Sequence, residues 1–227
     1  MRRRLRVKKT FGERSAPSEH RNPNPVYVIS IAGEGKTEEQ YFDGIKNIVS
    51  SGSIHIERLE KTDTKDTKSH PLYVLELLIE RAERWEEYGI TANELWMIVD
   101  RDKQNVSVKQ LQNILGECKK QGFNLALSAP AFELWLLLHL TDLDDYNRET
   151  IFENPKTKSK SKKRYLDSEI SKLAGGYNKT KLNFSKFEPG IPKAIARGKK
   201  LPLDNMLLID QPGTTVCLLV EKLMEGI

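Results

Sequence analysis

Three carboxylates stand where two apolar runs of the chain end. Glu34 lies between two glycines just after residues 26–31, and Asp100 and Asp102 follow residues 95–99. Carboxylate oxygens are the ligands that Mg²⁺ prefers, and flanking glycines leave room for a substrate backbone. We therefore predict a pocket that binds Mg²⁺ or Mn²⁺ and in which a phosphodiester bond is cut. Asp100 and Asp102 would hold the metal, and Glu34 would bind it or move a proton.

The sequence Gly35-Lys36-Thr37 favours a competing interpretation, because these residue types end the phosphate-binding loop of many NTPases. That loop needs a glycine five places before Gly35, where this chain has Ser30. The loop is therefore too short to wrap a triphosphate. Since Asp100 resembles the magnesium-binding acid of such enzymes, a P-loop NTPase stays open as the less favoured alternative.

Apolar runs of strand length alternate with stripes of helical spacing through the first 130 residues. The strands are predicted at residues 26–31, 54–59, 94–99 and 123–127, and the helices begin near residues 38, 71 and 108. This alternation predicts an α/β fold with a mainly parallel sheet and helices on both faces. Ligands of such sheets bind at the carboxyl ends of the strands, which is where the three carboxylates fall.

Thr37 and Gln40 have the spacing of a capping box, which predicts that the first helix starts at Glu38. After residue 130, helical signals dominate the chain. Later helices are predicted at residues 132–140, 165–173 and 194–201 and after Thr214 or Thr215. We therefore divide the chain into a basic arm (1–25), a catalytic core (26–140) and a C-terminal helical extension (141–227).

The net charge of +5 is concentrated in two blocks. Residues 2–9 and 156–164 each hold six Lys or Arg and no acid. Beside an acidic pocket, such blocks favour contact with a nucleic-acid backbone. We expect residues 156–164 to form a mobile loop, and a purely solvated loop is the alternative.

Cys118 and Cys217 lie in apolar helical patterns, which predicts buried free thiols in a reducing compartment. No apolar run is long enough to cross a bilayer, and the charged N-terminus has no apolar segment typical of a secretory signal. We expect a cytoplasmic protein with no membrane partner.

The order of predicted elements and acids resembles the Toprim fold of topoisomerases, primases and OLD-type nucleases. Short motifs give a narrower resemblance to RloB-like proteins over nearly the whole chain. These motifs are Gly33-Glu34-Gly35, Thr37-Glu38, Tyr41-Phe42, Asp100 with Asp102, residues 132–139, Tyr177-Asn178-Lys179 and residues 212–216. The chain departs from the family at Ala129 and Gln211, where asparagine is usual.

The resemblance implies a Toprim-type nuclease of bacterial defence loci, encoded beside an ABC-type or AAA ATPase partner. It implies that Glu34, Asp100 and Asp102 are the metal-binding and catalytic acids. Glu38, from one of the motifs, and Glu133, an acid within an apolar run, join them as catalytic candidates. The substrate would be DNA or RNA, with tRNA among the candidates.

Four further side chains are candidates for substrate binding: Lys103, His139, Lys179 and Arg197. A lysine or arginine can steady a phosphate group, although a solvated cation is the alternative for Lys179 and Arg197. For His139 the alternative is a hydrogen-bonded core histidine. A non-catalytic module that binds nucleic acid or an ATPase also stays open as a function.

Overall fold

A computed structural model describes residues 27–31, 35–49, 54–57, 71–87, 94–102, 106–157 and 163–225. Its centre is a sheet of β1 (Tyr27–Ile31), β2 (Ile54–Glu57), β3 (Glu94–Asp100), β4 (Asn124–Ala129) and β5 (Gly213–Thr214). The strand order is β2-β1-β3-β4-β5. β1 to β4 pair in parallel and β5 runs antiparallel to β4. The predicted α/β fold with a mainly parallel sheet is therefore confirmed.

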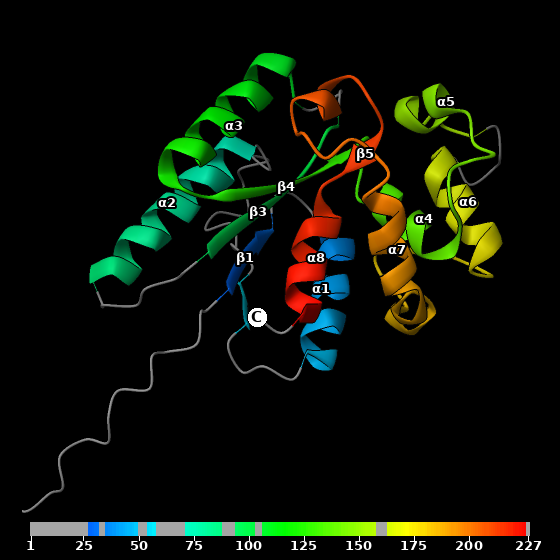
Figure 1. The fold of residues 1–227 in the computed structure, drawn as a ribbon, viewed down its shortest axis with the longest axis horizontal. Helices are drawn as coiled ribbons and strands as arrows, with labels where there is room; N and C mark the ends of the chain where they lie inside the picture. The colour runs from blue at the N-terminus through cyan, green and yellow to red at the C-terminus, as the bar shows by residue number, and fades with distance from the viewer. Residues whose placement is uncertain are drawn as a thin grey trace, which may run out of the picture.

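Helices surround this sheet (Figure 1). They are α1 (Lys36–Ile48), α2 (Pro71–Glu87), α3 (Val108–Gln121), α4 (Glu133–Leu140), α5 (Arg148–Glu153), α6 (Tyr165–Leu173), α7 (Ile191–Gly198) and α8 (Val216–Glu225). Three short 3-10 turns are η1 (Phe184–Lys186), η2 (Glu188–Gly190) and η3 (Leu207–Ile209). The sequence did not predict β5, α5 or the 3-10 turns, because each is too short to show a period.

The side chains of β3 point alternately into two apolar cores, one on each face of the sheet. Trp96 and Ile98 pack in the core shared with α1, α4 and α8, whereas Met97 and Val99 pack in the core shared with α2 and α3. Side chains of a strand point alternately to its two faces, so each core takes every second residue. Helices therefore cover both faces, as predicted. Asp100 shares its parity with Ile98 and belongs to the α1 and α4 side.

The last part of the chain belongs to the same core as the first. Cys217 and Leu219 of α8 lie in one buried cluster with Phe42 of α1 and Trp96 of β3. The backbone N–H of Thr215 donates to Leu127 O at 2.9 Å, next to the β4–β5 pair. The predicted extension at 141–227 is thus integrated into the sheet and its helical layer rather than appended to them.

Both cysteines are free and buried, as predicted, and they lie in opposite cores. Burial raises the pKa of each thiol to about 11, so both are protonated at neutral pH. This fits their interpretation as small hydrophobic residues.

The predicted capping box of α1 is wrong. The helix starts at Lys36, two residues earlier than predicted, and its N-cap Gly35 makes no side-chain cap hydrogen bond. Thr37 Oγ1 instead donates to Lys179 O at 3.0 Å, and Gln40 Nε2 donates to Thr180 O at 3.2 Å. A distant segment therefore uses the two polar side chains that the local pattern assigned to the helix end.

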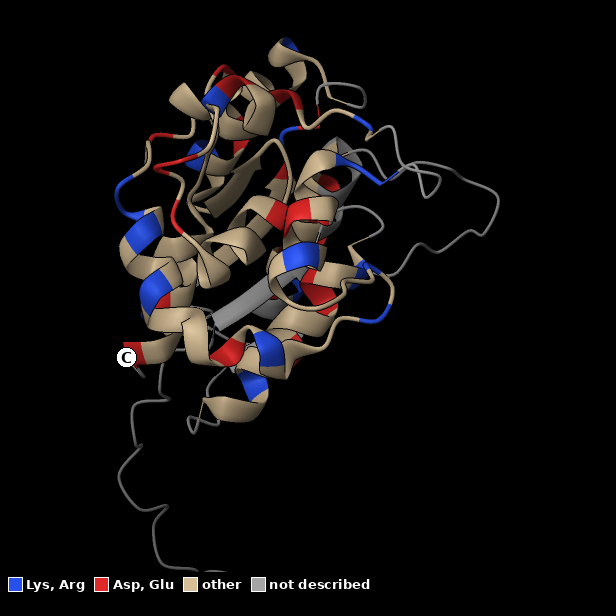
Figure 2. Cartoon of the chain, turned by 90° about the vertical axis from the view of Figure 1, so that its right-hand side faces the viewer, with Lys and Arg blue, Asp and Glu red and all other residues tan. Residues whose placement is uncertain are grey.

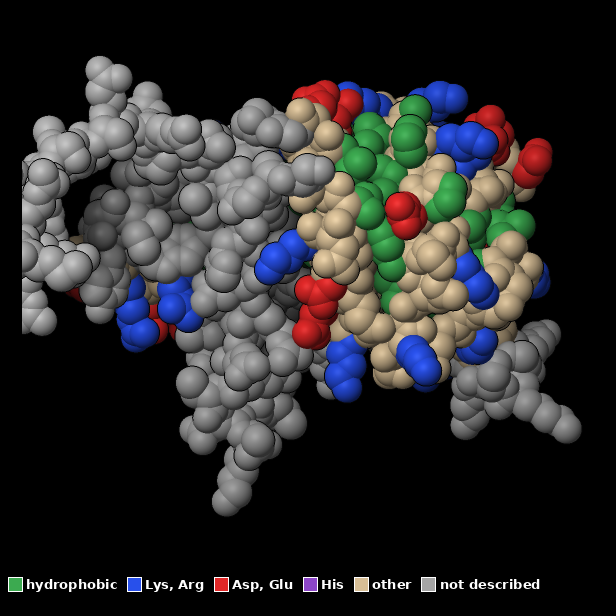
Figure 3. Space-filling view, turned by 90° about the horizontal axis from the view of Figure 1, so that it is seen from below, with side chains coloured by type: hydrophobic (Ala, Val, Ile, Leu, Met, Phe, Trp, Pro, Cys, Tyr) green, Lys and Arg blue, Asp and Glu red, His purple; other side chains and the backbone are tan. Residues whose placement is uncertain are grey.

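Charges of both signs are interspersed over the face that Figure 2 presents. Seen from below, a band of hydrophobic side chains lies among scattered acids and bases (Figure 3). Exposed large hydrophobic residues in the described ranges include Leu203, Met206 and Leu207 near η3. The described residues therefore present no uniform basic surface in these two views. Within the described ranges, no helix is both long and apolar enough to span a membrane.

The two predicted basic blocks fall largely outside the described residues. These are the arm at 1–25 and the middle of the lysine-rich block at 158–162. The ends of that block are described, and Lys156 and Arg164 make an isolated antiparallel bridge. Lys163 Nζ donates to Tyr177 O at 3.4 Å, so the second end of the block lies beside the segment that follows α6.

Candidate functional site

Four carboxylates gather around one lysine at the carboxyl end of β3. We call Glu38, Asp100, Glu133, Asp167 and Lys179 the acidic cluster. Glu38 comes from α1, Asp100 ends β3, Glu133 begins α4 and Asp167 lies in the first turn of α6. Lys179 follows α6. The strand parity described above turns Asp100 toward α1 and α4, which bring their acids to the same edge of the sheet.

Lys179 holds two of these acids directly. Its Nζ lies 2.9 Å from Glu133 Oε1 and 3.2 Å from Asp167 Oδ1. The Tyr177 hydroxyl also donates to Glu133 Oε1, at 3.1 Å. Glu133 and Asp167 are 4% and 7% exposed, yet 45% of the Lys179 side chain is exposed. The ammonium is therefore accessible from solvent while its partners are not.

One ammonium among four carboxylates leaves the cluster short of positive charge. Burial raises the pKa of Glu38 to about 7, Glu133 adds to this rise, and a backbone hydrogen bond and Lys179 oppose it. Burial also raises the pKa of Asp100 well above its usual range, helped by Glu38 and Glu133. Burial in a low dielectric and like charges both disfavour ionisation. Without a further cation, the cluster therefore retains protons near neutral pH.

Asp100 is the least satisfied member of the cluster. Its Oδ1 is buried and has no hydrogen-bond partner. A buried carboxylate oxygen without a partner is costly, and such an atom calls for an explanation such as an ion. Its hard-oxygen chemistry fits a divalent cation of the magnesium type. Across the described ranges, however, no group of three or more His, Cys, Asp or Glu has the geometry of a metal site.

The other two acids predicted for the metal site are Glu34 and Asp102. Glu34 lies outside the described residues, as does Lys103. Asp102 is half-buried, and its backbone oxygen accepts from Val106 N at 2.9 Å. Arg101, between the two aspartates, is buried and donates to Ile209 O and Val106 O, so its guanidinium supports the loop after β3.

His139 lies in the core, away from the acidic cluster. Its Nδ1 is 2.9 Å from Trp135 O, and a carbonyl can only accept, so Nδ1 carries the proton. Its Nε2 then accepts from the Tyr41 hydroxyl at 3.0 Å. Burial lowers the pKa of His139 to about 4. Both ring nitrogens are occupied inside the protein, so this arrangement leaves neither for the predicted contact with substrate.

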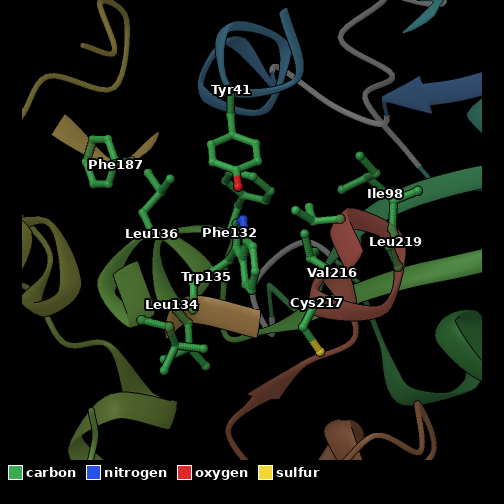
Figure 4. Close-up of a cluster of buried hydrophobic side chains, with 14 of the residues drawn as sticks. Tyr41, Ile98, Phe132, Leu134, Trp135, Leu136, Phe187, Val216, Cys217 and Leu219 are labelled. Carbon is green, nitrogen blue, oxygen red and sulfur yellow. The ribbon is translucent and has the colours of Figure 1, made fainter. Parts of the chain in front are cut away.

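The ring of Tyr41 points from α1 toward Phe132 and Trp135 (Figure 4). The rings of Tyr41 and Phe132 pack edge to face, with centroids 5.5 Å apart. Arg197, another predicted substrate residue, donates from Nη1 to Leu138 O at 2.6 Å. It therefore satisfies a carbonyl in the last turn of α4, which is a structural task.

Sequence reasoning missed Asp167 altogether. In the sequence it follows a lysine-rich stretch and has the pattern of an ordinary acid in a first helical turn, a role it also fills by accepting from Arg164 N at 3.3 Å. Tyr177 appeared only within a family motif. No local signal distinguishes either residue, because α6 reaches the edge of the sheet only in the folded chain.

Comparison with known proteins adds one positive result. The family model described as RloB-like protein matches residues 29–223. Comparisons with curated proteins and with solved structures gave no match.

Proposed function

The chain belongs to the RloB-like family, and on that premise we propose that it is a metal-dependent nuclease that hydrolyses phosphodiester bonds of DNA or RNA. One observation carries the proposal: Asp100 Oδ1 is buried without a hydrogen-bond partner, in a cluster with excess negative charge. A divalent cation relieves both defects at once. The parallel sheet with Asp100 at the carboxyl end of β3 agrees with a Toprim-type core.

Asp100 would hold Mg²⁺ or Mn²⁺ together with Glu34 and Asp102, the acids that the family resemblance supplies. When bound, the cation provides Lewis-acid stabilisation of negative charge on the phosphoryl oxygens. The acids around Asp100 attract cations, and Lys179 already pairs with two of them, Glu133 and Asp167.

Glu38 is suited to move a proton, because a general base works best when its pKa lies near the operating pH. Its carboxylate takes a proton from the attacking water while the water oxygen bonds to phosphorus. The bond from phosphorus to the leaving ribose oxygen breaks, and solvent protonates that oxygen. Lys179, exposed beside the buried acids, steadies a phosphate oxygen.

The family resemblance extends the proposal to the cell. The nuclease would act as the effector of an anti-phage system, alongside an ABC-type or AAA ATPase partner. Lys163, at the described end of the lysine-rich block, lies next to Tyr177, so phosphates bound by that block would lead toward the acidic cluster.

The test is incubation of the purified protein with plasmid, single-stranded DNA and tRNA, with Mg²⁺ or Mn²⁺ and with EDTA. We expect cleavage of at least one substrate that EDTA abolishes and that Asp100→Asn lacks. Asp144→Asn, an exposed acid near the end of α4, is the matched control. Cleavage that persists in EDTA, or in Asp100→Asn, would contradict the proposal.

A non-catalytic binding module is the second candidate, favoured by one observation. Glu133 and Asp167 already have a cation partner in Lys179, as a purely structural ion-pair network would. That function predicts equal nucleic-acid binding with and without Mg²⁺ and no cleavage under either condition. The P-loop NTPase is disfavoured further, because the Thr37 hydroxyl that would face magnesium donates to Lys179 O.

A further inference from the structure

We propose that Gln40 is a positioning residue for Lys179, and that it sets where the one cation of the acidic cluster meets a substrate phosphate. The inference rests on the proposed function for its consequence in catalysis. Its structural part stands on the contacts between α1 and residues 177–184, which we call the lysine strap.

The strap packs along one face of α1. Thr37, Gln40 and Gly44 follow one another at spacings of three and four residues, so they line up on one side of the helix. Thr37 Oγ1 donates to Lys179 O at 3.0 Å. A Cβ atom at Gly44 would overlap Cγ of Phe184, so glycine is required for the ring to pack on the helix. The strap thus runs along α1 in the direction of the helix.

Gln40 makes the central contact of this face and uses both ends of its amide. Its Nε2 donates to Thr180 O at 3.2 Å, and its Oε1 accepts from Leu182 N at 2.7 Å. Nε2 also donates to Lys36 O at 2.8 Å, which fixes the amide on its own helix. A single side chain therefore satisfies a carbonyl and an amide on the two sides of Lys181.

The strap has its own internal order, so a fixed backbone fixes Lys179. Asn178 Oδ1 accepts from both Thr180 N and Thr180 Oγ1 at 2.9 Å, which closes a tight turn around Lys179. The position of the Lys179 ammonium then depends only on its side-chain torsions, and Glu133 and Asp167 hold the ammonium in place. Losing the Gln40 contacts loosens the attachment of the strap to α1 after Lys179, so the turn that carries the ammonium is held less firmly.

The ordinary interpretation is that Gln40 is one polar surface contact among many. Two facts argue against it. The amide contacts the strap at both ends, and its partners Thr180 and Leu182 follow closely after Lys179, the only lysine that touches the acids of the cluster in the described part of the chain. If Gln40 acts through Lys179, a double-mutant experiment has a specific expected result that a simple structural role does not predict. The effects of removing the two residues cannot add.

The experiment is a double-mutant cycle in the full chain with Gln40→Met, Lys179→Met and the double variant. The readout is the affinity for a fluorescently labelled single-stranded DNA in EDTA, measured by anisotropy. We expect each single variant to bind about 3- to 10-fold more weakly, the size of one net polar contact. The double variant should bind no more weakly than Lys179→Met alone. Gln112→Met, an exposed glutamine of α3, should bind like the wild type.

Hydrogen exchange at the Leu182 amide gives a second readout that needs no nucleic acid. It should speed up in Gln40→Met and stay unchanged in Lys179→Met. Gln40→Glu keeps the acceptor for Leu182 N and provides a second variant if Gln40→Met does not fold. Wild-type affinity in Gln40→Met, or effects that add in the double variant, would overturn the inference. Failure of the wild type to cleave any substrate would sink the nuclease and leave this cycle interpretable.

Discussion

α1 and α4 build two buried regions that contain ionisable groups, and the two regions treat those groups differently. In the first, which we call the aromatic region, the rings of Tyr41, Trp135 and His139 pack together. There His139 is neutral, and its two ring nitrogens are hydrogen-bonded to the Tyr41 hydroxyl and to Trp135 O. In the acidic cluster, one turn before Tyr41 on α1, four carboxylates share one lysine and Asp100 Oδ1 has no partner.

His139 is a buried group whose hydrogen bonds are all made, whereas Asp100 is a buried carboxylate whose burial costs free energy. Trp135 Nε1 is also buried without a partner, but it is neutral, so it costs about 1–3 kcal/mol. A buried carboxylate facing like charges costs more unless it protonates or finds a cation. Because folding alone does not favour such an arrangement, the acidic cluster is the region where a ligand would restore the balance.

The largest expected effect comes from Asp100→Asn. We expect cleavage to fall by at least about 10²–10³-fold, as for loss of a key electrostatic group. Metal-free protein should melt about 2–4 °C higher, since asparagine removes a buried carboxyl group that is costly either to ionise or to protonate, a gain of roughly 1 kcal/mol. Scanning calorimetry with and without Mn²⁺ checks this, and Mn²⁺ should stabilise only the wild type. A variant that melts lower than the wild type without metal would remove the contrast between the two regions.

Glu38 should make the metal-free protein less stable as pH rises. Its pKa is near 7 in the folded protein and 4.5 unfolded, so between these values the folded state holds the extra proton. The free energy of unfolding then falls by about 3 kcal/mol from pH 4.5 to pH 7 on this account. Because His139 acts in the opposite direction over much of this range, urea titrations should show stability rising more steeply with pH in Glu38→Gln than in the wild type, by about this amount. The same slope in both proteins would assign it to another group.

His139 should act in the opposite direction. Its pKa is about 4 folded and 6.5 unfolded, so the unfolded chain binds the extra proton in this window. Stability is fully present above pH 6.5 and decreases by about 3 kcal/mol as pH falls to 4. Glu38→Gln should make this loss on the acid side larger, whereas in His139→Gln stability should fall as pH rises, through Glu38 and Asp100. Parallel profiles for the two variants would show that the regions do not differ as argued.

The smallest effect concerns Arg197. Arg197→Met removes the bond to Leu138 O at the end of α4, which should cost about 1 kcal/mol and lower the melting temperature by about 2–4 °C. Its affinity for single-stranded DNA should match that of Lys193→Met, an exposed cation of the same helix. Weaker binding specific to Arg197→Met would return this residue to the substrate site.

Local sequence patterns determined the sheet and the position of Asp100. The four parallel strands were predicted within a few residues, because a buried strand needs a continuous apolar run and its neighbours need turn signals. The acid at the end of β3 follows from the same run. Glu38 and Glu133 were candidates by motif and by their apolar context, and both lie in the acidic cluster.

Tertiary structure alone decided which groups meet. Asp167 and Lys179 join Glu38 and Asp100 across many residues of intervening chain, and nothing in their own neighbourhoods records that approach. Thr37 and Gln40 show the physical reason most clearly. Their side chains can bond either to a helix end or to a passing backbone, and the local pattern cannot rank these partners. The lysine strap packs on α1 only after the core has formed, and its backbone then takes those bonds.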